Sequence, residues 1–103
     1  MNKKPNDALP KAGRMIRSAL EKKGWTQSKL AQLTAMPAPI INDYISGKRA
    51  GINPKQVIRI ALPLGLDPYD LARAFVEHSI DIEMSKLFDK IKVWSASDKE
   101  EEQ

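Results

Sequence analysis

Residues 25–48 contain two short stretches whose apolar residues recur at helical spacing, and only a few residues separate them. Thr26 is suited to cap the first stretch, because its hydroxyl can accept a hydrogen bond from a free backbone N–H of the first turn. The segment Ala35-Met36-Pro37 interrupts the pattern, and a second helix resumes at Pro37 or Ala38, where a missing N–H costs nothing. Two short helices joined so tightly are expected to cross at a steep angle.

Similar spacing predicts helices on both sides of this pair. They are expected over roughly 9–23, from Asn53 to a break or kink at Pro63, from Asp67 onward, and from Met84 to Trp94. Leu33 and Ile58 are among the residues expected to face inward. No repeat or pair of strands stands out, so the fold class is all-α, with a five-helix domain and a C-terminal amphipathic helix.

The chain of 103 residues suits one domain with a modest core. We expect a flexible basic arm over 1–8, the domain over 9–79, the C-terminal helix over 80–95 and a disordered acidic tail over 96–103. The sequence lacks cysteine, a signal peptide and an apolar run long enough for a membrane span. These features predict a cytoplasmic protein with no membrane partner.

Charge is divided unevenly along the chain. Residues 1–62 hold twelve Lys and Arg against three Asp and Glu, a net charge of +9, whereas residues 63–103 hold five against ten, a net charge of −5. A polyanion would therefore be attracted to the first part and repelled by the second. Chance segregation in a small protein is the alternative.

Catalytic and metal-binding patterns are missing from the sequence. His78 is the single histidine, and no cysteine or carboxylate pair is spaced to complete a metal site with it, so we expect a surface or interface residue. No serine or aspartate has a base positioned beside it by its spacing. The sequence therefore predicts no enzyme, no cofactor and no metal.

Several short motifs occur together at the spacing of a known family: Gly24-Trp25-Thr26-Gln27, Leu30-Ala31, Gly47-Lys48-Arg49, Asn53-Pro54 and Leu64-Gly65-Leu66-Asp67-Pro68. Over about residues 12–75 the chain resembles the Cro/cI-type (XRE-like) helix-turn-helix domain, the λ-repressor-like fold of phage repressors and many bacterial regulators. It also shows some similarity to HigA-like antitoxins. Ile45 stands where phage repressors usually carry a glutamate, and the matching position on the first helix is Leu20, which predicts an apolar contact in place of an ion pair.

The resemblance implies that the helix beginning near Pro37 enters the major groove of double-stranded DNA. The base-contacting residues expected from it are Pro37, Ala38, Pro39, Asn42 and Asp43, and the phosphate-contacting residues are Gln27, Lys48, Arg49, Lys55 and Arg17. Asn42 is the strongest reader, since a bidentate contact to adenine gives about 1–3 kcal/mol of discrimination. The residue types in this stretch are atypical of the family. Two alternatives therefore stay open: the surface binds DNA mainly by shape and charge, or it binds a protein partner.

Ala35 occupies a position where the family favours glycine, because the bend often needs a left-handed backbone. An alanine in that conformation costs on the order of 1 kcal/mol. We expect the turn to form nevertheless.

An apolar stripe in the C-terminal helix consists of Met84, Leu87, Phe88, Ile91 and Trp94. Since the domain closes its own core, we expect this stripe to form a homodimer interface, as DNA half-sites one turn apart require. The predicted function is that of a sequence-selective transcriptional regulator, a repressor of a palindromic operator. Two alternatives remain: an antitoxin that neutralises a toxin protein and regulates its own operon, and a protein-binding adaptor that no longer reads DNA.

Overall fold

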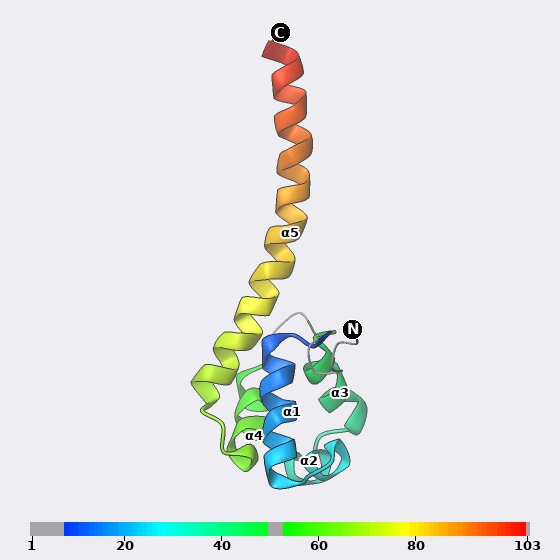
Figure 1. Ribbon diagram of the computed structural model, residues 1–103, viewed down its shortest axis with the longest axis vertical. Coiled ribbons are helices and arrows are strands. Elements are labelled where there is room, and N and C mark those ends of the chain that lie inside the picture. Colours follow the sequence, from blue (N-terminus) through cyan, green and yellow to red (C-terminus); the bar gives the residue numbers. More distant parts are fainter. Residues whose placement is uncertain (1–7, 50–52, 103) are drawn as a thin grey trace, which may run out of the picture.

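The computed structural model describes residues 8–49 and 53–102, with side chains over 8–49 and 53–91. Its five helices are α1 (Lys11–Lys23), α2 (Gln27–Thr34), α3 (Ala38–Ser46), α4 (Pro54–Leu64) and α5 (Pro68–Glu102), shown in Figure 1. The described residues contain no strand. This confirms the predicted all-α class, with a five-helix domain that is extended by a C-terminal helix. Residues 1–7 of the expected basic arm lie outside the described part.

The first helix organises the bundle. α1 packs against α3, α4 and α5, while α2 packs against α3 and α4. Figure 1 shows α1 between α3 on one side and α4 with the first turns of α5 on the other. The α2–α3 pair is thus fixed to the rest of the domain by two other helices, which is what a rigid binding surface requires.

One buried apolar cluster holds these helices together: Ala12, Ile16, Ala19, Leu20, Leu30, Met36, Ile41, Tyr44, Ile45, Val57, Ile60, Ala61, Leu64, Leu71, Ala74 and Phe75. Both Leu20 and Ile45 belong to it, as expected for an apolar pair. The Tyr44 and Phe75 rings meet edge to face, with centroids 5.5 Å apart. Leu33 and Ile58 were wrongly expected inside, since both side chains are about half exposed.

Gly13 allows α1 and α3 to approach closely. A Cβ atom at this position would overlap the backbone carbonyl oxygen of Ile45 in α3. Any side chain at residue 13 would push the two helices apart, because a backbone carbonyl in a helix cannot rotate away. The distance between α1 and α3 therefore depends on this glycine.

Two expected helix boundaries differ from the structure. Pro63 does not end α4 early, because it lies in the last turn, where the lost N–H removes a single hydrogen bond. Gly65 caps the end of the helix instead. Its backbone N–H donates to the carbonyl of Leu62, and the N–H of Leu66 donates to the carbonyl of Ala61. α1 begins at Lys11 rather than near residue 9.

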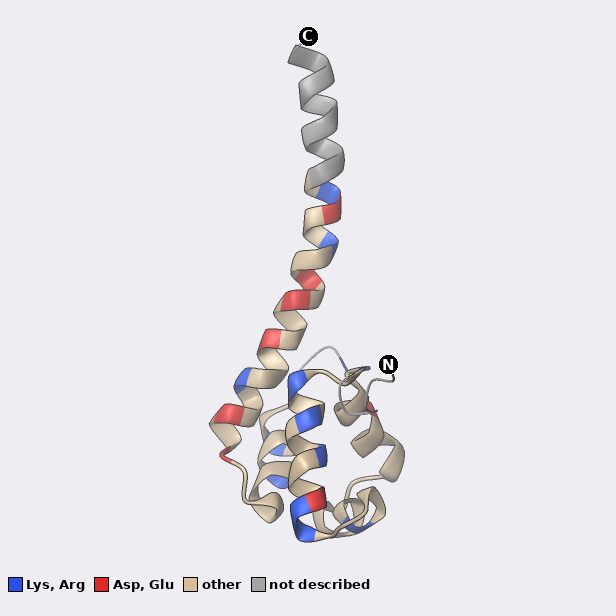
Figure 2. Cartoon of the chain, viewed as in Figure 1, with Lys and Arg blue, Asp and Glu red and all other residues tan. Residues whose placement is uncertain are grey.

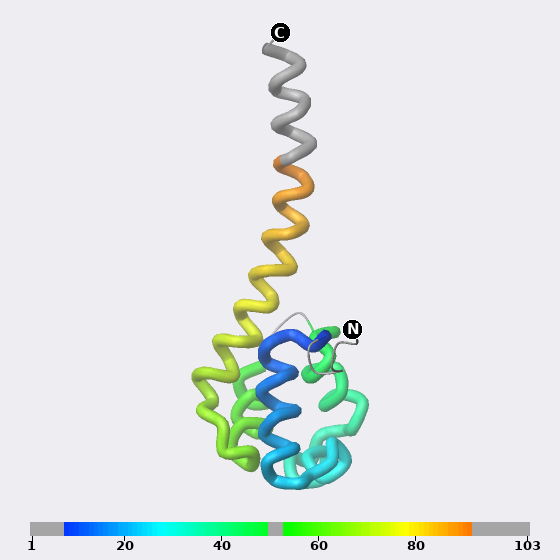
Figure 3. The backbone as a smooth tube through the Cα atoms, in the orientation of Figure 1, coloured from blue at the N-terminus to red at the C-terminus, as the bar shows by residue number. Residues whose placement is uncertain are grey.

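The fifth helix and the C-terminal helix are one element. α5 runs without a break from Pro68 to Glu102. The helix therefore continues through the boundary expected at residue 80. It also includes residues 96–102, which were expected to be disordered. No glycine or proline follows Pro68, and nothing in the sequence ends the helix. Its far half projects away from the bundle (Figures 1 and 3), and the longest dimension is 62 Å.

Candidate nucleic-acid interface

The bend between α2 and α3 is a tight turn, in which the N–H groups of Ala35 and Met36 bond back to α2. Thr26 caps α2 by accepting a hydrogen bond from the Lys29 backbone N–H at 3.1 Å. At the other end Ala35 adopts φ 57° and ψ 33°, the left-handed conformation expected from the sequence. The next residue, Met36, is buried and donates its N–H to the carbonyl of Ala31. The buried Met36 therefore ties the turn to the core and to the last turn of α2.

The helix after the turn has an inward and an outward face. Ile41, Tyr44 and Ile45 point into the core. Pro37, Ala38, Pro39 and Asn42 are all exposed, so the structure brings four of the five predicted base-contacting residues together on the free surface at the start of α3.

Asp43, the fifth of these residues, lies at the edge of the outward face. Its side chain is half-buried, and its backbone carbonyl accepts hydrogen bonds from the N–H groups of Gly47 and Lys48, both at 3.1 Å. It therefore helps to end α3. Its carboxylate would repel phosphate, so a base contact from Asp43 requires a cytosine amino group.

The outward face of α3 offers one strong hydrogen-bonding reader. Asn42 can donate and accept at once, which is the pattern of an adenine edge in the major groove. Ala38 and Pro39 supply only apolar contact, suited to a thymine methyl group. α3 contains no lysine or arginine, so the attraction to a polyanion must come from its neighbours.

Cations follow α3 directly. Lys48, Arg49 and Lys55 are exposed, Lys55 in the first turn of α4. The Arg49 guanidinium lies 5.4 Å from the centroid of the Tyr44 ring, a cation–π contact that the sequence analysis did not anticipate. Since Tyr44 is part of the α3 core face, this contact keeps Arg49 beside the end of that helix.

Gln27 and Arg17 are placed differently from these three. Gln27 is the first residue of α2 and half-buried, at the helix end where the first backbone N–H groups have no partner within the helix. Arg17 is also half-buried, one turn after Gly13 on the α1 face toward α3. Its Nε is buried without a hydrogen-bond partner among the described residues, so part of the guanidinium is withdrawn from the surface.

His78 connects α5 to the end of α3. Its half-buried ring places Nε2 3.3 Å from the carbonyl oxygen of Gly47, the residue that ends α3. With the proton on Nε2, the ring donates to this carbonyl, as a side chain at a helix C-terminus can. His78 was expected at the surface or at an interface. It connects α5 to the end of α3 through a residue 31 positions earlier in the sequence.

The two signs of charge separate in space as they do in the sequence. Figure 2 shows Lys and Arg along α1 and on α4, whereas acidic residues outnumber basic ones along the described part of α5. The bundle therefore carries the positive field, and the projecting helix carries the negative one. A nucleic acid would be drawn to the bundle.

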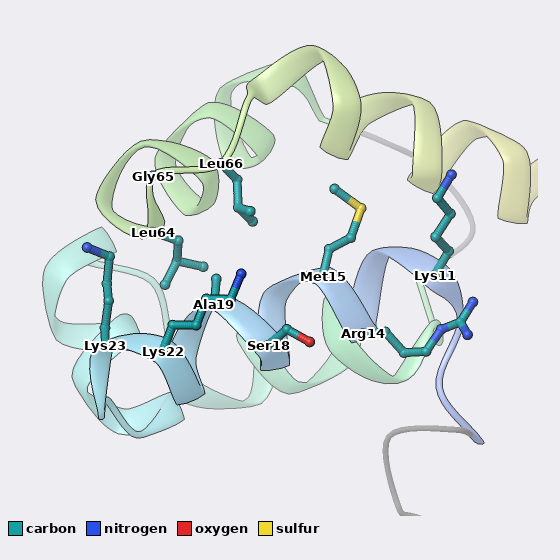
Figure 4. Close-up of a pocket in the computed structure, with 10 residues that line it drawn as sticks. All are labelled: Lys11, Arg14, Met15, Ser18, Ala19, Lys22, Lys23, Leu64, Gly65 and Leu66. Atoms are coloured by element: carbon teal, nitrogen blue, oxygen red, sulfur yellow. The ribbon is translucent and has the colours of Figure 1, made fainter.

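Part of this positive charge surrounds a hollow rather than α3. The hollow is about 730 Å³ in volume. It is lined by residues of α1, by Leu64 at the end of α4, and by Gly65 and Leu66 after it, but by no residue of α2 or α3. In Figure 4 Met15 and Leu66 point into it, while Lys11, Arg14, Lys22 and Lys23 stand around it. These cations add to the field of the bundle without facing the outward surface of α3.

The exposed stripe of α5 is also present. Met84, Leu87, Phe88 and Ile91 are each between 40% and 53% exposed, whereas the Trp94 side chain lies outside the described residues. Within residues 8–49 and 53–91 no three His, Cys, Asp or Glu side chains are grouped to hold a metal ion. No helix in that part of the chain is long and apolar enough to cross a bilayer.

A family model described as a helix-turn-helix domain matches residues 13–74, more than half of the chain, and this range includes most of α1, all of α2 to α4 and the start of α5. No curated protein matches the sequence. The expectation of a helix-turn-helix domain is therefore confirmed, and the matched range contains the complete α2–turn–α3 unit.

Proposed function

Because this chain belongs to the helix-turn-helix family, we propose that it is a sequence-selective regulator of transcription that binds double-stranded DNA with α3 in the major groove. The observation that carries the proposal is the outward face of α3, where Pro37, Ala38, Pro39 and Asn42 are exposed on a helix fixed by a rigid turn. Asn42 would read an adenine, and its three apolar neighbours would contact thymine methyl groups.

Phosphate contacts would surround this helix. We assign them to Gln27 at the start of α2, to Lys48 and Arg49 after α3, and to Lys55 in α4, with Arg17 adding charge behind α3. Each phosphate neutralised in B-DNA steepens the log–log dependence of affinity on salt by about 0.9. Backbone contacts would fix the position of α3, and Asn42 would supply the sequence information.

The proposed regulator binds as a homodimer. Met84, Leu87, Phe88 and Ile91 leave an apolar surface on α5, and we assign the dimer interface to them and to Trp94. A two-fold dimer matches a palindromic operator, because each copy then contacts one half-site. Such a dimer would cover its operator and exclude other proteins from it, so we propose a repressor of its own or a neighbouring operon.

Selection of bound fragments from random DNA tests the reading of bases. The full chain should enrich a palindromic motif, and Asn42→Ala should relax that motif at one position in each half-site. Enrichment of the same motif by both proteins would contradict the role of Asn42. Absence of any retained complex, even at low salt, would contradict DNA binding altogether and favour the protein-binding adaptor.

Gel shifts over a salt series test the phosphate contacts. Lys48→Ala removes one cation from each copy, so a dimer should lose about 2 from the magnitude of its log–log slope. Lys86→Ala is a matched control, because Lys86 is an exposed lysine on the projecting part of α5. Equal changes in slope for the two variants would contradict the placement of Lys48 at DNA.

An antitoxin role is the second candidate, and the exposed apolar side chains of α5 favour it. In that case the residues assigned above to the dimer would bind a toxin, and DNA binding would serve only to regulate the operon. A small basic ribonuclease-like protein encoded by the adjacent gene, which forms a stable complex with this chain when co-expressed, would support this candidate.

A further inference from the structure

A continuous apolar stripe runs along α5, from the bundle to its projecting half. Its members follow one another at intervals of three or four residues on one side of the helix: Tyr69, Ala72, Val76, Ile80, Met84, Leu87 and Ile91. Tyr69 is 77% exposed, and Val76 and Ile80 are 38% and 49% exposed. The helix is held to the bundle through a different side, that of Leu71, Ala74 and Phe75.

The bundle end of this stripe is hollow. One hollow, about 390 Å³, lies between α4 and α5 and is lined by Pro54, Val57, Ile58, Pro68, Tyr69 and Ala72. A second, about 290 Å³, continues along α5 and shares Tyr69 and Ala72 with the first. The projecting end has the opposite character, since it presents the long side chains of Met84, Leu87, Phe88 and Ile91.

We propose that a second copy of this chain lies antiparallel along this stripe, with its projecting half over the two hollows and Ile80 at the two-fold axis. Three pairs of apolar residues are placed symmetrically about Ile80: Val76 and Met84 are each four residues from it, Ala72 and Phe88 eight, and Tyr69 and Ile91 eleven. In an antiparallel pair centred there, each of these apolar residues meets the mirrored residue of its partner. Leu87 is the stripe residue without an apolar counterpart, because Arg73 is its mirrored residue. The inference specifies the homodimer of the proposed function and rests on that part of it.

The apolar area available supports this register. With about 200 Å² for a large aromatic side chain and about 100 Å² for an aliphatic one, the exposed fractions of the stripe, Phe88 and Ile58 amount to about 500 Å² per copy. Two copies then bury about 1,000 Å², the size at which specific interfaces begin. A pairing confined to the projecting halves leaves Tyr69, Val76 and Ile58 uncovered and loses nearly half of this area.

The charges beside the stripe predict how the stability of the dimer depends on salt. Glu77, Asp81 and Glu83 lie near Ile80, so two copies bring six carboxylates close to the axis. Lys11 pairs with Glu77 and Lys86 with Glu83 in each copy, which leaves a net charge of about −2 there, carried by the two copies of Asp81. Salt screens such repulsion, and the dimer should therefore tighten as salt rises. A pairing centred between Ser85 and Lys86 would instead place Asp81 opposite the partner's Lys90, and that dimer would weaken with salt.

Single cysteines test the register, because the chain has none of its own. In the proposed pair the Cα atoms of the two copies of residue 80 are about 3.5–5.5 Å apart, given helix axes 8–10 Å apart, and the upper part of this range suits a disulfide. Ile80→Cys in the full chain should therefore form a covalent dimer on mild oxidation, as should the double variant Val76→Cys/Met84→Cys. Leu87→Cys should not, since its two copies would be 14 residues, or about 21 Å, apart along the axis.

Each other outcome overturns the proposal. Cross-linking of both Ile80→Cys and Leu87→Cys indicates a parallel pair. Cross-linking of Met84→Cys/Leu87→Cys without Ile80→Cys indicates the pairing centred near residue 86. A monomer in sedimentation at tens of micromolar, with native circular dichroism, would mean that another protein covers the stripe.

A pair of exposed apolar residues provides the matched control. Tyr69→Ser should raise the dimer dissociation constant at least tenfold, because Tyr69 lines both hollows and occurs twice in the dimer. Leu62→Ser should leave it unchanged, since Leu62 is 63% exposed on α4 but lines neither hollow. Gel shifts of the same proteins keep the two proposals apart: the cross-linking pattern can hold without DNA binding, and DNA binding can hold with a parallel pair.

Discussion

Replacement of Ala35 by glycine should stabilise the protein. Ala35 is the one residue other than glycine with a positive φ in the described part of the chain, at φ 57° and ψ 33°. The left-handed region costs an L-residue about 1–2 kcal/mol, because Cβ comes too close to the following carbonyl oxygen. The side chain of Ala35 is exposed, so Ala35→Gly removes this cost without opening a cavity.

The gain is partly offset in the unfolded chain. Glycine has more conformational freedom there than alanine, which favours unfolding by about 0.4–1 kcal/mol. The net expectation is an increase of about 0.5–1 kcal/mol in the free energy of unfolding, or a rise of about 3–6 °C in Tm for a domain of this size. Urea and thermal unfolding followed by circular dichroism at 222 nm measure both quantities.

Gly24→Ala is the matched control for this prediction. Gly24 ends α1 with φ 67° and ψ 29°, and a Cβ atom there would meet no other atom within 4 Å. The variant should therefore lose about as much stability as Ala35→Gly gains, for the same steric reason with the opposite sign. A lower Tm for Ala35→Gly would refute the reasoning, as would a Gly24→Ala variant as stable as the natural sequence.

Three further substitutions probe the contacts that position α2 and α3. Gly13→Ala should lower the free energy of unfolding in urea by about 1–3 kcal/mol or more, because its methyl group would overlap the carbonyl of Ile45. A variant as stable as the natural sequence would contradict this close approach. Thr26→Ala should cost about 0.5–2 kcal/mol while Thr26→Ser keeps most of the cap; equal losses would argue against the hydrogen bond to Lys29. His78→Ala should cost about 1 kcal/mol and speed hydrogen exchange at the end of α3, whereas unchanged exchange would exclude His78 as a support of that helix.

Local signals were sufficient for much of the fold. Glycine at 24, 47 and 65 and caps at Thr26 and Asn53 fix where helices begin and end, since these effects act within one or two turns. The left-handed Ala35 followed from the resemblance to a family that favours glycine there. These are properties of neighbouring residues, and they depend little on what the rest of the chain does.

Errors arose where the outcome depended on packing between helices. Ile58 has the spacing of a core residue, yet only its neighbour Val57 is buried, and Ile58 is left half exposed beside a hollow between α4 and α5. The expectation that Pro63 ends α4 early failed for a local reason instead, because a proline in the last turn removes a single hydrogen bond. The continuity of α5 past residue 80 could not be recognised from two separate apolar patterns, because no residue between them marks either a stop or a start.

By itself the sequence determined the class of the protein: short helices with capped ends, a tight bend before Pro37, and basic charge on the same part of the chain. The tertiary structure alone decided which side chains are free to act. It exposed Asn42 and its apolar neighbours, withdrew part of Arg17, joined His78 to the end of α3, and extended the apolar stripe of α5 back to Tyr69. The physical reason is that spacing along a helix states which residues share a face, whereas only the packed bundle states which faces are left uncovered.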